Sequence, residues 1–429
     1  MDYTIIPTGE KIKTLREKYK LNQDEIVGND ITRNLISQIE NGKAKLTQNT
    51  AEVIMTHVKE KLKKKGMTLD ISIDYLLEDE EAQAKIILDN SIAELEELLK
   101  NNDINFNDTL KQVEEFLLKF DFVDKKVKIY ELAADYFFQN NYFYKALVYY
   151  ESVRRHINLN MDIVQLISVL IKLSKTYYYM GKYQDGIDVC KYALDRFPEL
   201  DSYSKTIFLF NICLYFNYLK QYDNALEYIY ILEPDVDTKV KDIEAKIRLL
   251  KASCLYNLKR YEESLVSYKE LLDNTQKNDY GNKSIYYSNL AEIYIDMENH
   301  EEAKKYLNMV LNDISSIPED YECLPQLYLE IGRRYIKLNY QQKAVAYLKK
   351  SLELAKQFKY AFVISDALIE LMKCIQEKTE VDIKKEFLDL TSNYKEVNNI
   401  LLINTLKYFS SLNDNETVQY ICDNYLKSI

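Results

Sequence analysis

Small and large side chains recur at a fixed spacing through the middle of the chain. A small residue returns at intervals of 39 to 41 positions, and another small residue stands twelve positions before each of them. Three positions after the earlier small residue of each unit stands a large residue, and nine positions after the same small residue stands a mostly aromatic one. The two small columns are Ala134, Ser174, Cys213, Ala252, Ala291 and Gly332, and Ala146, Gly186, Ala225, Ser264, Ala303 and Ala344. This spacing predicts pairs of helices that cross closely at their small residues.

Helical patterns also flank these clear units, which span about residues 128–357. Apolar positions in residues 80–130 predict at least one further helical pair. Residues 358–429 are expected to form degenerate units that cap the array, because terminal repeats have no neighbour to pack against. The chain has only 8 Gly and 5 Pro in 429 residues, too few for the turns of a many-stranded β protein. The sequence therefore predicts an all-α protein.

The first 77 residues show shorter helical patterns. An amphipathic segment over residues 9–19 is followed by Asn22, a good N-cap for a second short helix. Thr32 then caps a third helix over residues 33–40, which ends at Asn41 and Gly42. Its apolar residues face a core, while its polar side chains are free to meet base edges. Those polar residues are Arg33, Asn34, Ser37 and Gln38.

This stretch resembles the Cro/C1-type (Xre-like) helix-turn-helix domain over about residues 7–77. The resemblance is carried by the run Asn22-Gln23-Asp24-Glu25-Ile26 and by the later run from Thr32 to Lys43, which ends Ile-Glu-Asn-Gly-Lys. It implies that Gln23, Asn41 and Lys43 hold phosphates, while Arg33, Asn34 and Gln38 read bases. We expect residues 1–77 to be a domain that binds double-stranded DNA. Its predicted contacts are Gln23, Thr32, Arg33, Asn34, Ser37, Gln38, Asn41 and Lys43.

Charge is distributed unevenly along the chain. Residues 1–66 carry 13 Lys and Arg against 9 Asp and Glu, whereas the whole chain carries 57 against 68. A basic head on an acidic body suggests that the head meets an anion. The chain opens without a secretory signal pattern, shows no membrane-spanning run, and has six widely spaced Cys. We expect a cytoplasmic protein with no membrane partner.

The repeat spacing resembles the tetratricopeptide repeat, lengthened from 34 to about 40 residues per unit. The resemblance implies that residues 78–429 form a right-handed superhelix of helix pairs, whose first helices line a groove. Helical phase indicates which side chains on the first helices point away from the packing columns. Tyr and Asn among them suit an extended peptide, because Asn pairs with backbone amides and Tyr adds contact area. The predicted peptide-binding residues are Lys175, Tyr178, Tyr179, Asn217, Tyr218, Tyr256, Asn257, Glu292 and Arg333.

The order of the two parts resembles the RNPP-type peptide-sensing regulators of Gram-positive bacteria. This resemblance implies a quorum-sensing transcription regulator, a homodimer whose repeats bind a short signalling peptide and thereby control DNA binding by the head. An alternative of a different class stays open: a protein-interaction module that sequesters another regulatory protein, with DNA binding secondary.

Enzymatic motifs are not apparent in the sequence. His57, His156 and His300 are dispersed, and the chain has no Gly-rich phosphate loop, no GxSxG and no HExxH. We expect neither an enzyme nor a bound cofactor or metal.

Overall fold

The computed structural model describes residues 3–28, 30–157, 163–240, 242–375, 381–393 and 399–425. Every regular element among these residues is a helix, which confirms the predicted all-helical class. The chain divides into two compact units, Met1–Leu200 and Asp201–Ile429. Among the described helices, none combines the length and apolar character that crossing a bilayer requires.

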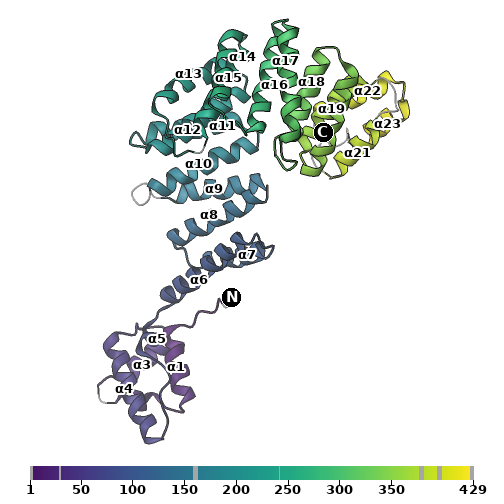
Figure 1. Cartoon of the computed structure of the whole chain (residues 1–429). Coiled ribbons are helices and arrows are strands. Elements are labelled where there is room, and N and C mark those ends of the chain that lie inside the picture. Colours follow the sequence, from purple (N-terminus) through teal and green to yellow (C-terminus); the bar gives the residue numbers. More distant parts are fainter. Residues whose placement is uncertain are drawn as a thin grey trace. The chain divides into compact units, whose positions relative to one another are not determined.

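Five helices at the start of the first unit enclose a core of their own (Figure 1). Each helix contributes to it, through Ile12, Ile26, Ile36, Ile54 and Leu76 respectively. The helices are α1 (Thr8–Lys18), α2 (Gln23–Val27), α3 (Arg33–Glu40), α4 (Gln48–Lys64) and α5 (Ile73–Leu77). The α2–α3 pair is thus held by burial of its apolar face.

Side-chain caps start α2 and α3 where the sequence predicts them. The Glu25 amide donates to Asn22 Oδ1 and the Asn22 amide donates to Glu25 Oε2, both at 2.9 Å, which makes a capping box. Thr32 Oγ1 accepts from the Leu35 amide at 3.2 Å. Gly28 ends α2 at a φ of 57°, and a Cβ there would lie 2.2 Å from Nε2 of His57. The turn between the two helices therefore requires glycine.

The rest of the first unit is a succession of antiparallel helices (Figure 1). The further pair predicted within residues 80–130 is present as α6 and α7, and two of the clear repeat units follow it. The helices are α6 (Glu80–Lys100), α7 (Phe106–Leu117), α8 (Val123–Gln139), α9 (Phe143–His156), α10 (Ile163–Tyr179) and α11 (Tyr183–Arg196).

The described part of the second unit contains four helix pairs and ends in four further helices. Its pairs are α12 (Ser202–Tyr218) and α13 (Tyr222–Leu232), α14 (Ile243–Asn257) and α15 (Tyr261–Asp273), α16 (Tyr280–Asp296) and α17 (His300–Asp313), and α18 (Leu324–Lys337) and α19 (Gln341–Phe358). The last helices are α20 (Ala361–Cys374), α21 (Ile383–Asn393), α22 (Asn399–Ser411) and α23 (Asn415–Tyr425). Two short 3-10 helices, η1 (Glu233–Asp235) and η2 (Ile314–Ser316), follow α13 and α17.

The predicted crossing of each pair at small residues is confirmed. Every residue of both small columns is buried. Ser264 Oγ donates to the Ala252 carbonyl across the α14–α15 crossing at 2.8 Å. A Cβ added to Gly332 would lie 2.7 Å from the side chain of Leu348 on α19. The helices approach too closely for larger side chains at these positions.

Candidate functional site

Helix α3 presents the polar face that the sequence predicts. Ile36 and Ile39 are buried in the head's core, whereas Arg33, Asn34 and Gln38 are exposed. Residues four apart on a helix share a face, so these side chains form one short polar surface together with the half-buried Ser37. The surface has hydrogen-bond donors and acceptors suited to base edges.

A buried carboxylate braces α3 against α1 and α2. Glu40, whose side chain is 6% exposed, accepts from Arg16 Nε at 2.9 Å and from Gln23 Nε2 at 2.9 Å. The hydrogen bond to Glu40 raises the pKa of Arg16 and outweighs the effect of burial. Sequence reasoning missed the pairing of Arg16 with Glu40, because partners 24 positions apart leave no local pattern. The sequence also predicted that Gln23 contacts a phosphate. In the structure its side-chain amide donates a hydrogen bond to Glu40.

Arg33 lies against α2 with its guanidinium accessible. Its Nη1 lies 3.5 Å from Asp24 Oδ2, and its Nε donates to Gln23 Oε1 at 3.4 Å. The side chain is 67% exposed, and exposed ion pairs contribute little free energy. A ligand can therefore compete for Arg33 at small cost in free energy.

The remaining predicted DNA contacts lie around the ends of α3. Thr32 caps its first turn, as described above. The Asn41 side-chain amide donates to the Ser37 carbonyl at 2.7 Å, and the Lys43 backbone amide donates to the Gln38 carbonyl at 2.7 Å. Both side chains are exposed beyond the C-terminus of α3. The structure thus gathers all eight predicted residues on the α2–α3 pair and the turn after it.

In the first unit, the predicted peptide-binding residues of α10 belong to an aromatic patch. The Tyr179 ring stacks on Phe143 with centroids 5.0 Å apart, and Lys175 Nζ lies 5.2 Å from the Phe138 ring centroid. Tyr178 packs edge-on against Tyr179 at 5.3 Å. Tyr179 is exposed, so the patch can contact a ligand.

A polar cluster adjoins this patch between α8 and α10. Lys172 Nζ donates to Glu131 and Asp135 at 2.8 Å each, and Tyr150 of α9 donates to Asp135. Burial alone would lower the pKa of Lys172, but the two carboxylates outweigh it and raise that pKa. Burial, followed by the charge of Asp135, raises the pKa of Tyr150. A cavity of about 180 Å³ beside the cluster is lined by Asp135, Phe138, Gln139, Tyr150, Lys172 and Lys175.

In the second unit, the predicted asparagines make weak or local contacts. Cys254 Sγ donates to Asn217 Oδ1 at 3.6 Å, and the Asn257 side-chain amide donates to the carbonyl of Ser253 in its own helix at 2.8 Å. Asn257 and Tyr218 are exposed, while Asn217 is half-buried. Asn257 can exchange its bond within α14 for a ligand, because its side chain is exposed.

The other predicted residues of this unit belong to an ion-pair network along the first helices. Glu292 accepts from Arg334 Nη2 at 2.7 Å and from Lys337 Nζ at 3.1 Å. Tyr256 of α14 donates to Asp296, which also accepts from Lys337 at 2.9 Å. The network thus links α14, α16 and α18.

Arg333 extends the network toward α20. Its guanidinium donates to Glu330 at 2.8 Å, Asp366 at 2.9 Å and Glu370 at 3.2 Å. Sequence reasoning selected Glu292 and Arg333 as ligand contacts and missed that carboxylates and cations on neighbouring helices hold them. The partners on neighbouring helices lie 33 to 45 positions away in the sequence, about the length of one repeat.

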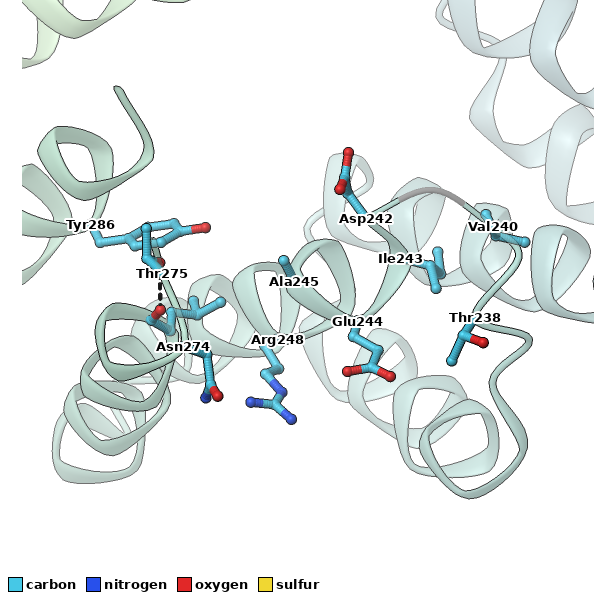
Figure 2. Close-up of a pocket in the computed structure, with 11 residues that line it drawn as sticks. Thr238, Val240, Asp242, Ile243, Glu244, Ala245, Arg248, Asn274, Thr275 and Tyr286 are labelled. Carbon is cyan, nitrogen blue, oxygen red and sulfur yellow. Dashed lines mark hydrogen bonds between the residues drawn. The ribbon is translucent and has the colours of Figure 1, made fainter. Parts of the chain in front are cut away.

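The largest cavity described in the second unit lies at the N-terminal end of α14 (Figure 2). It has a volume of about 410 Å³ and is lined by residues before α14, by Arg248 and by Tyr286. Its polar side chains, such as Asp242, Glu244 and Asn274, are exposed. None of the predicted peptide-binding residues lines it.

The structure and the comparisons define an all-helical protein with tetratricopeptide repeats. The tetratricopeptide repeat family matches residues 244–312 and 283–357. No curated protein matches the chain.

Several solved structures are similar to the chain at low sequence identity. A tetratricopeptide repeat protein from Parabacteroides merdae is 16% identical and has a TM-score of 0.49, covering 66% of this chain and 98% of its own. The apo form of the quorum sensor NprR from B. thuringiensis is 17% identical and has a TM-score of 0.47. The match covers 79% of this chain and 99% of the NprR chain. A Rap protein complexed with competence and sporulation factor is 15% identical and has a TM-score of 0.41. The match covers 90% of this chain and 100% of the Rap chain. These likenesses concern the fold alone.

Proposed function

We propose that the chain is a cytoplasmic transcription regulator of the quorum-sensing kind. Residues 1–77 bind double-stranded DNA, and the tetratricopeptide repeats of residues 78–429 bind a short signalling peptide. The observation that carries the proposal is the polar face of α3, exposed on a helix that Glu40 braces against α1 and α2. A helix with exposed Arg, Asn and Gln near its start, braced from behind, suits the major groove.

The exposed side chains of this face, and Lys43 beyond the end of α3, have defined roles in the proposal. Arg33 pairs with guanine, Asn34 and Gln38 pair with adenine, and Lys43 neutralises a phosphate. Operators of such proteins are read by two heads related by symmetry, so we propose a homodimer.

In the proposal, peptide binding by the repeats regulates DNA binding by the head. Within the second unit, the exposed Tyr218 of α12, the exposed Asn257 of α14 and the half-buried Asn217 offer area and amide groups to an extended peptide. The peptide shifts DNA binding if it binds one arrangement of the protein better than another. An affinity ratio of about 10² shifts that equilibrium by about 3 kcal/mol.

DNA titration tests the first half of the proposal. The purified protein is titrated with duplex DNA from upstream of its own gene and with a scrambled duplex, at ~50 and ~200 mM salt. We expect preference for the upstream duplex and a loss of affinity of about tenfold or more at the higher salt, since Lys43 of each head releases counterions. Equal binding to both duplexes contradicts specific DNA reading and favours the alternative, a module that sequesters another regulatory protein.

Asparagine substitutions test the second half. We expect Asn217→Ala and Asn257→Ala to abolish the change in DNA affinity that a peptide fraction of the culture medium causes, with unchanged thermal unfolding. Asn274→Ala is the matched control, because the Asn274 side-chain amide makes the same kind of bond to the Glu270 carbonyl, at 2.7 Å, outside the first helices. Variants that respond like the parent would place the peptide elsewhere.

A further inference from the structure

A second cavity of the second unit lies between α16 and α18. Its volume is about 360 Å³, and its wall includes Ile285 and Ser288 from α16 and Gln326, Leu327 and Arg334 from α18. Cys323, the residue before α18, stands at the same cavity and is exposed. A reagent or ligand in solution can therefore reach it.

Three buried polar atoms of this wall have no hydrogen-bond partner among the described residues. They are Ser288 Oγ, Gln326 Oε1 and Arg334 Nε. Ser288 is 2% exposed and Arg334 is 3% exposed, so bulk water does not reach them freely. An unpaired buried polar group costs free energy, and such groups call for a ligand or an ordered water.

The bonds to charged neighbours determine which hydrogen-bond donors and acceptors of these side chains remain available. Arg334 donates through Nη2 to Glu292 at 2.7 Å and through Nη1 to Glu330, which leaves its Nε–H as a donor. Gln326 Nε2 donates to Glu330 at 2.9 Å, which leaves Oε1 as an acceptor. Ser288 adds a hydroxyl, which can donate or accept. The cavity thus presents at least one donor and one acceptor.

The charged groups of the wall are already paired with one another, because Arg334 donates to both Glu292 and Glu330. An ionic ligand group would have to compete with these pairs. A neutral amide has one carbonyl oxygen for Arg334 or Ser288 and an N–H for Gln326 Oε1. Its complementary groups match those that the wall leaves unpaired.

Arg334 also departs from the repeat pattern. It stands two positions after the small residue of its first helix, where the other units have uncharged buried residues. Those residues are Tyr136, Thr176, Tyr215, Cys254 and Ile293. Packing of a helix pair therefore does not require an arginine at this position.

We propose that the cavity between α16 and α18 binds a neutral amide group of the ligand, through Ser288, Gln326 and Arg334. The inference rests on the proposed peptide-binding function, and it names the chemistry of one anchoring point. Two sources supply this group: the peptide backbone, or an Asn or Gln side chain.

Modification of Cys323 reports whether the cavity is filled. The full-length protein is treated with methyl methanethiosulfonate, a neutral reagent without an amide, and the modification rate of Cys323 is followed by mass spectrometry. The probes are N-acetylglutamine methylamide, N-acetylalanine methylamide and sodium propionate. We expect saturable slowing of about threefold or more by an amide probe and none by propionate. Equal protection by both amides identifies the backbone as the source, and protection by the glutamine derivative alone identifies the side chain.

A matched pair of serines tests which atoms bind. Ser284 lies one turn before Ser288 on α16, and its hydroxyl is likewise buried without a partner among the described residues, but it does not line the cavity. We expect Ser288→Ala and Gln326→Met to weaken amide binding by about fivefold to tenfold, and Ser284→Ala to leave it unchanged. Both serine variants remove an unpaired hydroxyl, so both fold.

The proposal is overturned by protection that is equal in Ser288→Ala and the parent, by propionate protecting as well as the amides, or by no protection from any probe. The readout uses neither DNA nor the native peptide. A negative result in this experiment therefore contradicts only the amide site in the cavity. Conversely, a failure to bind DNA would not contradict that site.

Discussion

At Gly9 the first turn of α1 approaches the end of α3 so closely that a methyl group would lie 2.3 Å from the carbonyl oxygen of Ile39. The contact is to backbone, which cannot move aside as a flexible side chain can. Gly42, just beyond α3, is different: its φ is 69° and nothing lies within 4 Å of an added Cβ. The two glycines are needed for separate reasons, space and backbone conformation.

Alanine substitutions separate these reasons. Helix propensity alone would make Gly9→Ala stabilising by about 1 kcal/mol, so a destabilisation of about 2 kcal/mol or more identifies the clash. Gly42→Ala is expected to cost about 1 kcal/mol through backbone strain. Hydrogen exchange of residues 8–77 by mass spectrometry measures both. A Gly9→Ala head as protected as the parent would contradict the close approach of α1 and α3.

Glu131 provides a pH-dependent contribution to stability. Burial alone would raise its pKa, but hydrogen bonds from Lys172 and Gln165 outweigh burial and lower that pKa. A carboxyl with a lowered folded pKa stabilises the fold above its unfolded pKa, about 4.3, and this contribution is lost as pH falls through the folded pKa. The pair α8–α10 should therefore weaken in acid.

Glu131→Gln should flatten this dependence. We expect the urea midpoint of the variant to fall less than that of the parent between about pH 6 and pH 3, because glutamine does not titrate. Glu301→Gln is the control, since Glu301 is 89% exposed and pairs with Lys304 only at the surface. Parallel curves for Glu131→Gln and the parent would show that the Glu131–Lys172 pair contributes nothing.

At the scale of the elements, the turn inside each clear helix pair uses one residue in the left-handed conformation. Its φ lies between 59° and 67° in all six units. The residues are Asn141, Gly181, Lys220, Lys259, Glu298 and Asn339. The fold thus imposes the same turn even where the residue is neither glycine nor asparagine, at a cost of about 1 kcal/mol.

Exchanges at this turn should change stability in opposite directions. Lys259→Gly is expected to stabilise the repeats by about 0.5 kcal/mol, because relief of strain exceeds the added freedom of the unfolded chain. Gly181→Ala is expected to destabilise them by about 1 kcal/mol. Thermal unfolding monitored by circular dichroism compares them. Destabilisation by Lys259→Gly would contradict a strained turn.

The helix pairs and their crossings could be predicted from the sequence, whereas most of the polar network could not. Small residues in phase and Asn22 or Thr32 before an apolar run are local patterns, which report helix starts and close packing. Glu40 bonds to residues 17 and 24 positions away, and Arg333 bonds to Asp366 and Glu370, 33 and 37 positions away. Such pairs depend on which faces meet after folding. The one available signal was Arg334, a charge in an otherwise uncharged column.

At the scale of the whole chain, the basic excess of residues 1–66 contrasts with the acidic total. The proposed function assigns the two kinds of surface to two partners, DNA for the head and a peptide for the repeats. The acidic remainder of the chain would not attract DNA, so nucleic-acid binding should depend on the head alone.

The measurement that tests this account most directly is the base preference of Arg33→Ala. The parent, Arg33→Ala and the control Lys269→Ala, which removes a positive charge from an exposed position of α15, are titrated with the upstream duplex and with its single base-pair substitutions. We predict that Arg33→Ala loses about 1–3 kcal/mol of binding free energy and its discrimination at one base pair per half-site, while Lys269→Ala behaves as the parent. An Arg33→Ala variant with unchanged affinity and unchanged preferences would contradict base reading by α3.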